Sequence, residues 1–145
     1  MTLAAALIGS WRLVDFVTHD ARGHLARPFG VHPHGRLVYT PGGLMSVQIA
    51  CAARPTLRTS GFDDAVPEDE RTAFRSYLAY SGRYHLDGDS VLHEVDLSLD
   101  PDWVGQQLSR TAALAGDQLI LRTPSSFAIN GDQEPAELTW RREAA

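Results

Sequence analysis

The sequence has no lysine, only one cysteine and no long apolar segment, and each shortage excludes a class of protein. Its basic residues are thirteen arginines, scattered along the chain, against eighteen acidic residues, so the net charge is −5 at neutral pH. Surfaces that bind nucleic acid need clustered lysine and arginine, so we expect no nucleic-acid partner. Cys51 stands alone, which excludes an internal disulfide bond and a cysteine-based metal cluster.

The apolar segments are too short to cross a membrane, which requires roughly 20 consecutive apolar residues. Residues 3–8 are apolar but lack the basic flank of a signal peptide, and they lead directly into the first predicted strand. Hydrophobic residues make up 43% and charged residues 21% of the chain, which is typical of a globular domain. We therefore expect one domain over residues 1–145, in the reducing cytoplasm, without a membrane partner.

Apolar and polar residues alternate along most of the chain, with turn residues interrupting the alternation about every 8–12 positions, as in all-β folds. Glycine-containing turns at residues 41–43, 87–89 and 115–117 suit tight hairpins, so consecutive strands should be antiparallel. Eight such strands favour an up-and-down barrel, which leaves no free sheet edge. The predicted strands are Ser10–Val17, Arg36–Thr40, Leu44–Ile49, Ala79–Leu86, Ser90–Leu99, Gly105–Leu114, Gln118–Thr123 and Ala136–Arg142.

One short helix is predicted over Pro67–Leu78. Pro67 suits a first helical turn, and the acidic residues at positions 68–70 lie where the helix dipole favours negative charge. Phe74, Tyr77 and Leu78 recur at helical spacing, so this face should pack on the barrel. We expect the helix to lie across one mouth of the barrel as a lid.

Two polar residues fall on faces that are otherwise apolar, His93 in Ser90–Leu99 and Arg110 in Gly105–Leu114. The residues that should share these inward faces are Val91, Val95, Leu97, Leu99, Leu108, Ala112 and Leu114. A buried guanidinium is costly unless it is paired, so Arg110 should have a partner or water inside the barrel. If the two strands form a hairpin centred near residues 102–103, Arg110 lies near Val95, one inward step from His93.

Three tyrosines should add hydroxyl groups to the same cavity, namely Tyr39, Tyr80 and Tyr84. Trp103 is a candidate ligand contact at the mouth, although an aromatic that anchors a turn is the simpler interpretation. An apolar cavity with a few convergent polar groups is the usual form of a small-molecule site. The alternative is that His93 is an ordinary hydrogen-bonded core residue.

The other motifs give no good evidence for a metal, cofactor or catalytic site. Four histidines of the first long loop suggest part of a metal site, but their spacing is irregular in a segment rich in glycine and proline, so we predict no metal. They are His19, His24, His32 and His34. The chain has no phosphate-binding glycine motif and no nucleophile elbow around a serine, and we expect no cofactor.

Gly9-Ser10-Trp11, at the start of the first strand, resembles the Gly-x-Trp signature of lipocalins. In that family the tryptophan plugs the closed end of the barrel, and an arginine from the last strand packs across it; Arg142 is the matching position. Residues 9–13, 35–40, 80–84 and 101–105 extend the resemblance to the bacterial lipocalin-like domain family. The resemblance implies an eight-stranded barrel, and related small barrels include allene oxide cyclase-like proteins. The paired cysteines of secreted lipocalins are absent.

Three hypotheses about function follow. The first is a binder of a small apolar metabolite, with Arg110 and His93 contacting a polar oxygen at one end of it. The second is a cofactor-independent cyclase, isomerase or dehydratase of secondary metabolism, with His93 as general acid or base and Arg110 stabilising oxyanion charge. The third is a structural barrel packed with side chains. Whether the chain forms a homo-oligomer stays open.

Overall fold

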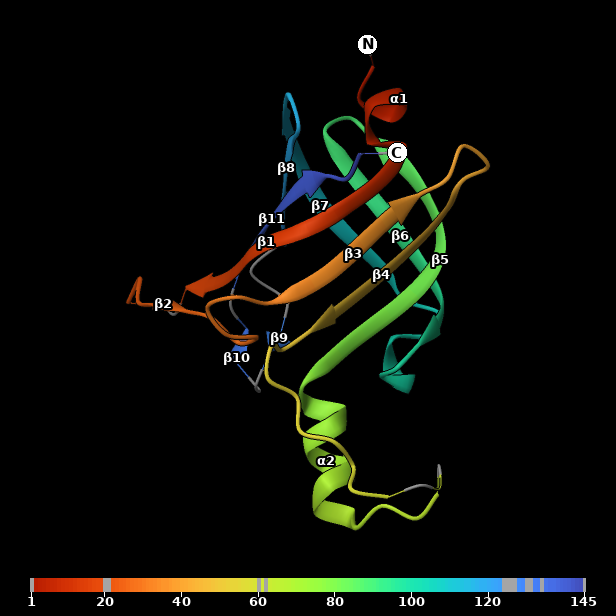
Figure 1. The fold of residues 1–145 in the computed structure, drawn as a ribbon. Coiled ribbons are helices and arrows are strands. Elements are labelled where there is room, and N and C mark those ends of the chain that lie inside the picture. The colour runs from red at the N-terminus through yellow and green to blue at the C-terminus, as the bar shows by residue number, and fades with distance from the viewer. Residues whose placement is uncertain are drawn as a thin grey trace.

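Eight strands form a closed antiparallel barrel in the computed structural model, which describes residues 2–19, 22–59, 61, 63–123, 128–129, 132–133 and 135–144 (Figure 1). Strands adjacent in the barrel follow one another along the chain, and β11 pairs with β1 to close it. The predicted up-and-down barrel is thus confirmed. The barrel strands are β1 (Gly9–His19), β3 (His34–Tyr39), β4 (Leu44–Ala50), β5 (Tyr77–Asp87), β6 (Ser90–Ser98), β7 (Gln107–Ala115), β8 (Gln118–Arg122) and β11 (Ala136–Arg142).

Shorter elements decorate the barrel: α1 (Leu3–Leu7), β2 (Leu25–Ala26), α2 (Pro67–Arg75), the 3₁₀ turn η1 (Pro101–Trp103), β9 (Ala128–Ile129) and β10 (Asp132–Gln133). The N-terminal apolar segment leads directly into the first strand, as expected, and itself forms α1. Its alanines and leucines are strong helix formers, and the Thr2 hydroxyl caps the helix by accepting from the Ala5 backbone amide. Of the helices that the structure describes, none has the length and apolarity to span a bilayer.

The lid prediction for α2 is wrong. The helix begins at Pro67 as predicted but ends at Arg75, and it extends away from the barrel instead of covering a mouth (Figure 1). None of its residues is buried, and Phe74 is 48% exposed. Tyr77 and Leu78 belong to β5, where they pair with β4. The helical spacing of these residues was a coincidence across a helix–strand boundary.

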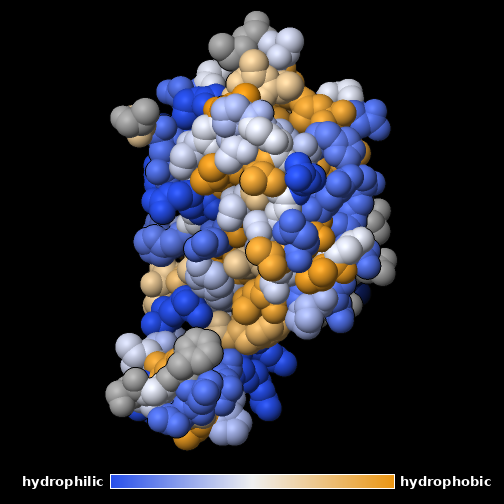
Figure 2. Space-filling model, turned by 90° about the vertical axis from the view of Figure 1, so that its right-hand side faces the viewer, coloured by the Kyte–Doolittle hydropathy of each residue, from blue (hydrophilic) through white to orange (hydrophobic). Residues whose placement is uncertain are grey.

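A β-bulge in β6 overturns part of the predicted inward face. Val91 and Val95 are buried, but Leu97 is 69% and Leu99 39% exposed. Val95 pairs with Gly82 whereas Leu97 pairs with Ser81, so β6 has one extra residue at this point and the alternation of its faces reverses. Exposed apolar side chains therefore lie among polar ones on the β5 side of the barrel (Figure 2).

The predicted register between β6 and β7 is also wrong. Arg110 lies opposite Val91 and not opposite Val95, because the connection through η1 is asymmetric. The Val95 carbonyl accepts from the Gly105 amide, which ends the strand pairing early on the β7 side. The error is four residues, an even number, so the faces were still assigned correctly. Arg110 remains a diagonal neighbour of His93.

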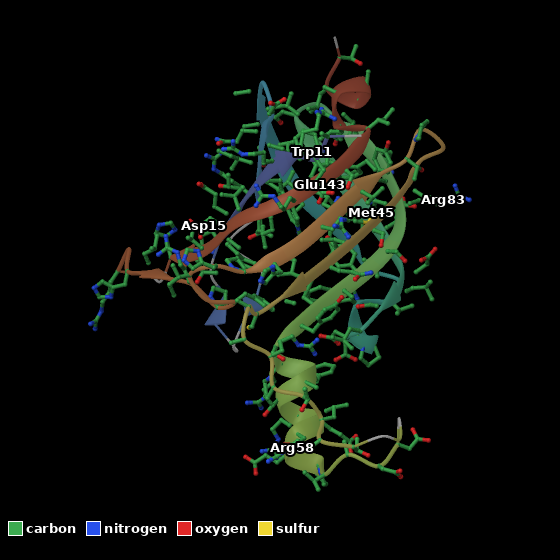
Figure 3. The ribbon with its side chains drawn as sticks, viewed as in Figure 1. Trp11, Asp15, Met45, Arg58, Arg83 and Glu143 are labelled. Carbon is green, nitrogen blue, oxygen red and sulfur yellow. The ribbon has the colours of Figure 1, made fainter. Side chains whose placement is uncertain are left out.

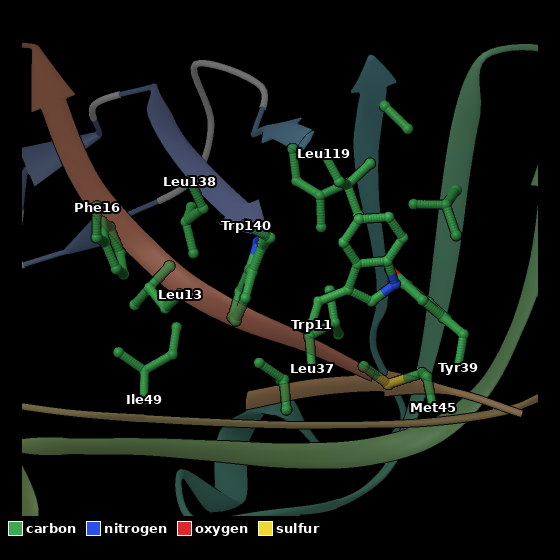
Figure 4. Close-up of a cluster of buried hydrophobic side chains, with 14 of the residues drawn as sticks. Trp11, Leu13, Phe16, Leu37, Tyr39, Met45, Ile49, Leu119, Leu138 and Trp140 are labelled. Atoms are coloured by element: carbon green, nitrogen blue, oxygen red, sulfur yellow. The ribbon is translucent and has the colours of Figure 1, made fainter. Parts of the chain in front are cut away.

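Inside the barrel, side chains from all eight strands pack into one apolar core (Figure 4). Trp11, Trp140 and Leu119 are no more than 1% exposed, as their positions in the alternation predict. Outward residues of the barrel strands reach solvent. Arg83 of β5 points away from the barrel, whereas Met45 of β4 lies within it (Figure 3).

Candidate functional site

The end of the barrel next to α1 is closed by Trp11. Its indole Nε1 donates to the Leu7 carbonyl at 2.9 Å, and the Arg142 Cζ lies 4.2 Å from the centroid of its ring. Arg142 also donates to the carbonyls of Ile8 and Ala6. Trp11 and Arg142 therefore make the contact that the predicted plug requires. Gly9 has φ +133°, and a Cβ at this position would lie 3.0 Å from the Arg142 Nη1, which explains the glycine of the motif.

A narrow cavity lies toward the opposite end. Most of its lining is apolar, and it includes residues near the strand ends farthest from Trp11. The cavity measures about 30 Å³, or about 420 Å³ when all space between side chains and the solvent at its mouth are counted. The smaller value holds on the order of one or two water molecules. The lining residues are Phe16, Leu37, Val47, Ile49, Leu78, Tyr80, His93, Trp103, Arg110, Leu121, Thr123, Leu138 and Trp140.

His93 forms the polar centre of this cavity. It is 1% exposed, and both of its ring nitrogens are engaged: Nε2 lies 2.7 Å from the Tyr39 hydroxyl, and Nδ1 lies 2.7 Å from the Tyr80 hydroxyl. These residues come from β3, β5 and β6, which are separated by up to 54 positions in the chain. The register of the sheet therefore brings together three groups that are remote in the sequence.

Arg110, from β7, lies beside this trio. Its guanidinium donates to the Ser109 carbonyl at 2.9 Å and lies close enough to Tyr80 to act against the rise in the pKa of that phenol, and the residue is only 6% exposed. His93 and Arg110 are thus both buried and both line this cavity. Arg110 brings a positive charge to the wall of an otherwise largely apolar cavity.

Burial sets the protonation of the trio. Loss of solvation, and secondarily the charge of Arg110, lower the pKa of His93 to about 3. Burial also raises the pKa of Tyr80, against the opposing effect of Arg110, and raises that of Tyr39 well above its usual value. At neutral pH the imidazole and both phenols are therefore uncharged. A histidine this weakly basic is poorly suited to general-base chemistry.

The remaining predicted residues lie at different depths. Trp103 lines the cavity and packs edge-on against Tyr80, with ring centroids 5.7 Å apart. Tyr39 lies behind His93, outside the lining. Tyr84 lies apart from the cavity: its hydroxyl donates to the Thr40 carbonyl at 2.7 Å, and its ring contacts that of Tyr39.

Two polar groups of the lining were missed. Thr123 is 6% exposed and accepts from the Ala136 amide at 2.7 Å; its spacing from Leu119 and Leu121 would have revealed it as inward-facing. Trp140 was predicted to point inward, but its buried Nε1–H has no hydrogen-bond partner among the described residues. No sequence pattern signals such an unsatisfied donor. An unpaired buried N–H costs about 1–3 kcal/mol, so an acceptor beside it would stabilise the protein.

The histidines of the first long loop do not form a metal site within the described ranges, where no three His, Cys, Asp or Glu side chains cluster as metal ligands. His32 and His34 instead border a solvent-open groove with Arg12 and Arg36.

Comparisons with known proteins agree with this architecture. A family model described as a lipocalin-like domain matches residues 8–143. A relative from Aspergillus oryzae, the 4'-hydroxy-3'-methoxypropiophenone carrier protein ppsC, is 33% identical over 106 residues, covering 68% of this chain and 96% of the relative.

Two solved structures are more distant, each 15% identical to this chain. One is a lipocalin-like protein from Bacteroides uniformis, with a TM-score of 0.46 and coverage of 94% of this chain and 98% of that one. The other is a mutant of the fluorescent protein UnaG, with a TM-score of 0.43 and coverage of 97% and 98%. On the strength of the family match over residues 8–143, this chain belongs to the lipocalin-like domain family.

Proposed function

We propose that this protein binds and carries a small, largely apolar molecule whose polar end is a hydrogen-bond-accepting oxygen. The observation that carries the proposal is the buried group formed by His93, Tyr80 and Arg110 in an otherwise largely apolar cavity. Apolar walls supply affinity, at about 25 cal/mol per Å² of surface removed from water. The polar group orients the oxygen and discriminates between ligands.

The carrier relative supports the ligand class. Its name specifies a propiophenone, an aromatic ring that bears a ketone. Such a molecule combines a flat apolar body with a carbonyl oxygen, which is the combination that this lining suits. We propose that the ligand is an aromatic compound that carries a carbonyl oxygen or an anionic oxygen.

The cavity is much smaller than the roughly 300–1,000 Å³ of typical ligand pockets. Binding of an aromatic compound therefore requires side chains at the mouth to move. Trp103 is suited to this movement because it is only half-buried and stands on the short η1 turn. We expect its fluorescence to change when the ligand enters.

Carriage is favoured over catalysis by the state of His93. Both of its nitrogens are hydrogen-bonded to tyrosines and its pKa is lowered, so it would have to lose a tyrosine partner before it could take a proton from a substrate. A carrier returns its ligand unchanged, which mass spectrometry of ligand recovered from the protein tests directly.

A titration with two matched dyes tests the proposal. N-phenyl-1-naphthylamine is neutral and apolar, and 1-anilinonaphthalene-8-sulfonate adds an anionic group to the same body. Both should bind the parent. Arg110→Leu should weaken binding of the sulfonate by about 1.5–3 kcal/mol, as expected for a hydrogen bond to a charged group, and leave the neutral dye nearly unaffected.

Arg83→Leu is the matched control, because Arg83 points away from the barrel (Figure 3). It should change neither affinity. If the parent binds neither dye, the barrel is a packed structural one. If Arg110→Leu weakens both dyes equally, Arg110 does not orient the polar end.

A further inference from the structure

The two tyrosines that flank His93 cannot play the same role. A neutral imidazole has one N–H donor and one acceptor nitrogen. Since both ring nitrogens lie 2.7 Å from a tyrosine hydroxyl, one hydroxyl must donate to the ring and the other must accept from it. The arrangement has two states, which differ in which tyrosine keeps its proton available for another partner.

The surroundings of Tyr39 make one of these states more stable than the other. Tyr39 is 1% exposed, lies outside the cavity lining, and its hydroxyl bonds only to His93 within the described part of the chain. If Nε2 carried the proton, the Tyr39 O–H would be a buried donor with nowhere to donate, at a cost of about 1–3 kcal/mol. If Tyr39 donates to Nε2, the O–H left over is that of Tyr80, which lines the cavity and can reach an acceptor there. The proton of His93 then resides on Nδ1.

In this state Tyr80 accepts a hydrogen bond from His93 instead of donating one. Its oxygen accepts from the Nδ1–H of His93, and the neighbouring Arg110 guanidinium can only donate. Neither group can accept from Tyr80, so its O–H proton is left for a further partner. Because Tyr80 lines the cavity, that partner is a group within it.

We infer that Tyr39 fixes His93 as the Nδ1–H tautomer, and that Tyr80 thereby presents its O–H to an acceptor oxygen of the ligand. The second half of this inference rests on the proposed function, since it needs a ligand in the cavity. Tyr39 and His93 are positioning residues, and Tyr80 is the binding residue.

Trp140 supports the same ligand chemistry independently. It lines the cavity, and its Nε1–H is a buried donor for which the described residues supply no acceptor. With Tyr80 and Arg110, the lining thus carries donors from three strands. Such a site selects a carbonyl or anionic oxygen and disfavours a ligand whose polar end is an ammonium group, because a donor facing donors is left unpaired.

The tautomer can be measured without any ligand. In protein labelled with ¹⁵N-histidine, two-bond ¹H–¹⁵N spectra distinguish protonated from unprotonated ring nitrogens, and the His93 signals are those absent from His93→Gln. We expect a protonated Nδ1 and an unprotonated Nε2. A protonated Nε2 would overturn the inference and leave the proposed function standing.

The donor role of Tyr80 needs two probes of equal shape. 2-Acetylnaphthalene carries a carbonyl oxygen, and 2-isopropenylnaphthalene replaces it with a methylene group. Tyr80→Phe should weaken ketone binding by roughly 3- to 10-fold, the effect of losing one neutral hydrogen bond, without weakening binding of the hydrocarbon. The carbonyl stretch of the ¹³C-labelled ketone should move to higher frequency in the variant.

Tyr77→Phe is the control, because the Tyr77 hydroxyl donates to Gln48 and lies outside the cavity lining. It should leave ketone affinity and the carbonyl frequency unchanged. Equal affinity of ketone and hydrocarbon for the parent, or no effect of Tyr80→Phe on the carbonyl stretch, overturns the donor role. Failure of both probes to bind the parent refutes instead the proposed function, and the tautomer measurement remains valid.

Discussion

Each end of the barrel holds an arginine, half-buried Arg142 at the closed end and buried Arg110 at the cavity end, and the two have different surroundings. At the closed end, Arg142 stacks on Trp11 and donates to backbone carbonyls of the residues just before it. At the cavity end, Arg110 donates to one backbone carbonyl, that of Ser109, and also lies near Tyr80 and His93 from other strands. The carbonyls that bind Arg142 belong to the backbone and cannot change partners freely, so the contacts at the closed end are fixed and structural. Hydroxyl groups can exchange partners, which the proposed binding of a ligand's oxygen at the cavity end requires.

Removal of the plug should have the largest effect. Trp11→Ala deletes a side chain with no exposed surface and should cost about 3–5 kcal/mol of unfolding free energy, measured by chemical denaturation. Trp103→Ala, a change of the same size at the half-buried mouth, should cost less. Equal losses for the two variants would show that the ends are not energetically distinct.

Exchange of each arginine for leucine sharpens the comparison. Arg142→Leu removes two hydrogen bonds from a charged group and a cation–π contact, and should lower stability by about 2–3 kcal/mol. Arg110→Leu also removes the desolvation cost of a buried guanidinium, so its stability should stay within about 1 kcal/mol of the parent. Thermal or urea unfolding of both variants measures the difference, and the reverse ranking would contradict it.

The buried histidine should make stability depend on pH. The pKa of His93 is about 3 in the folded chain, below the roughly 6.5 of an unfolded histidine, so between these values the unfolded state binds more protons. Stability should therefore fall as pH falls below about 6.5, by about 2 kcal/mol at pH 5, and this contribution should be flat above 6.5. Urea unfolding of the parent and His93→Gln isolates the effect, because the other histidines are common to both. Identical pH profiles would contradict it.

The smallest expected effect concerns Trp140. Trp140→Phe keeps an aromatic side chain but removes the orphan N–H, so stability should stay level or rise. Affinity for 2-acetylnaphthalene should fall by about 0.5–1.5 kcal/mol if this donor reaches the ligand. Fluorescence titration, with the expected change at Trp103 as its signal, measures the affinity. An unchanged affinity would show that Trp140 only fills space.

The closed end could be predicted because a short motif resembles a known family signature, and that resemblance implies the plug and its arginine. Gly9 and Trp11 form a short motif, and only Arg142 has to be brought from the far end of the chain. Strand alternation likewise placed His93 and Arg110 inside. Alternation depends only on the pleat of each strand, so it survived a register error of four residues.

The rest of the cavity depends on how strands are paired, which alternation does not specify. The hydrogen bonds of Tyr39 and Tyr80 to His93 require the register of four consecutive strands. The bulge that exposes Leu97 is accompanied by close contact at Gly82, where a Cβ would lie 1.8 Å from the Glu94 carbonyl oxygen. The alternation of apolar and polar residues in β6 does not predict this contact between Gly82 and Glu94. The lid prediction failed for a related reason, since the helical spacing ran on into β5.

The pairing of Trp11 with Arg142 has a practical consequence for handling the protein. It places the start of β1 and the end of β11 side by side, and both chain ends emerge at the plugged end of the barrel (Figure 1). A fluorescent fusion partner or a surface tether attached at either terminus would therefore stand away from the cavity mouth. The same proximity makes the barrel a suitable scaffold for circular permutation, with a short linker joining the present ends and new ones opened in an exposed hairpin.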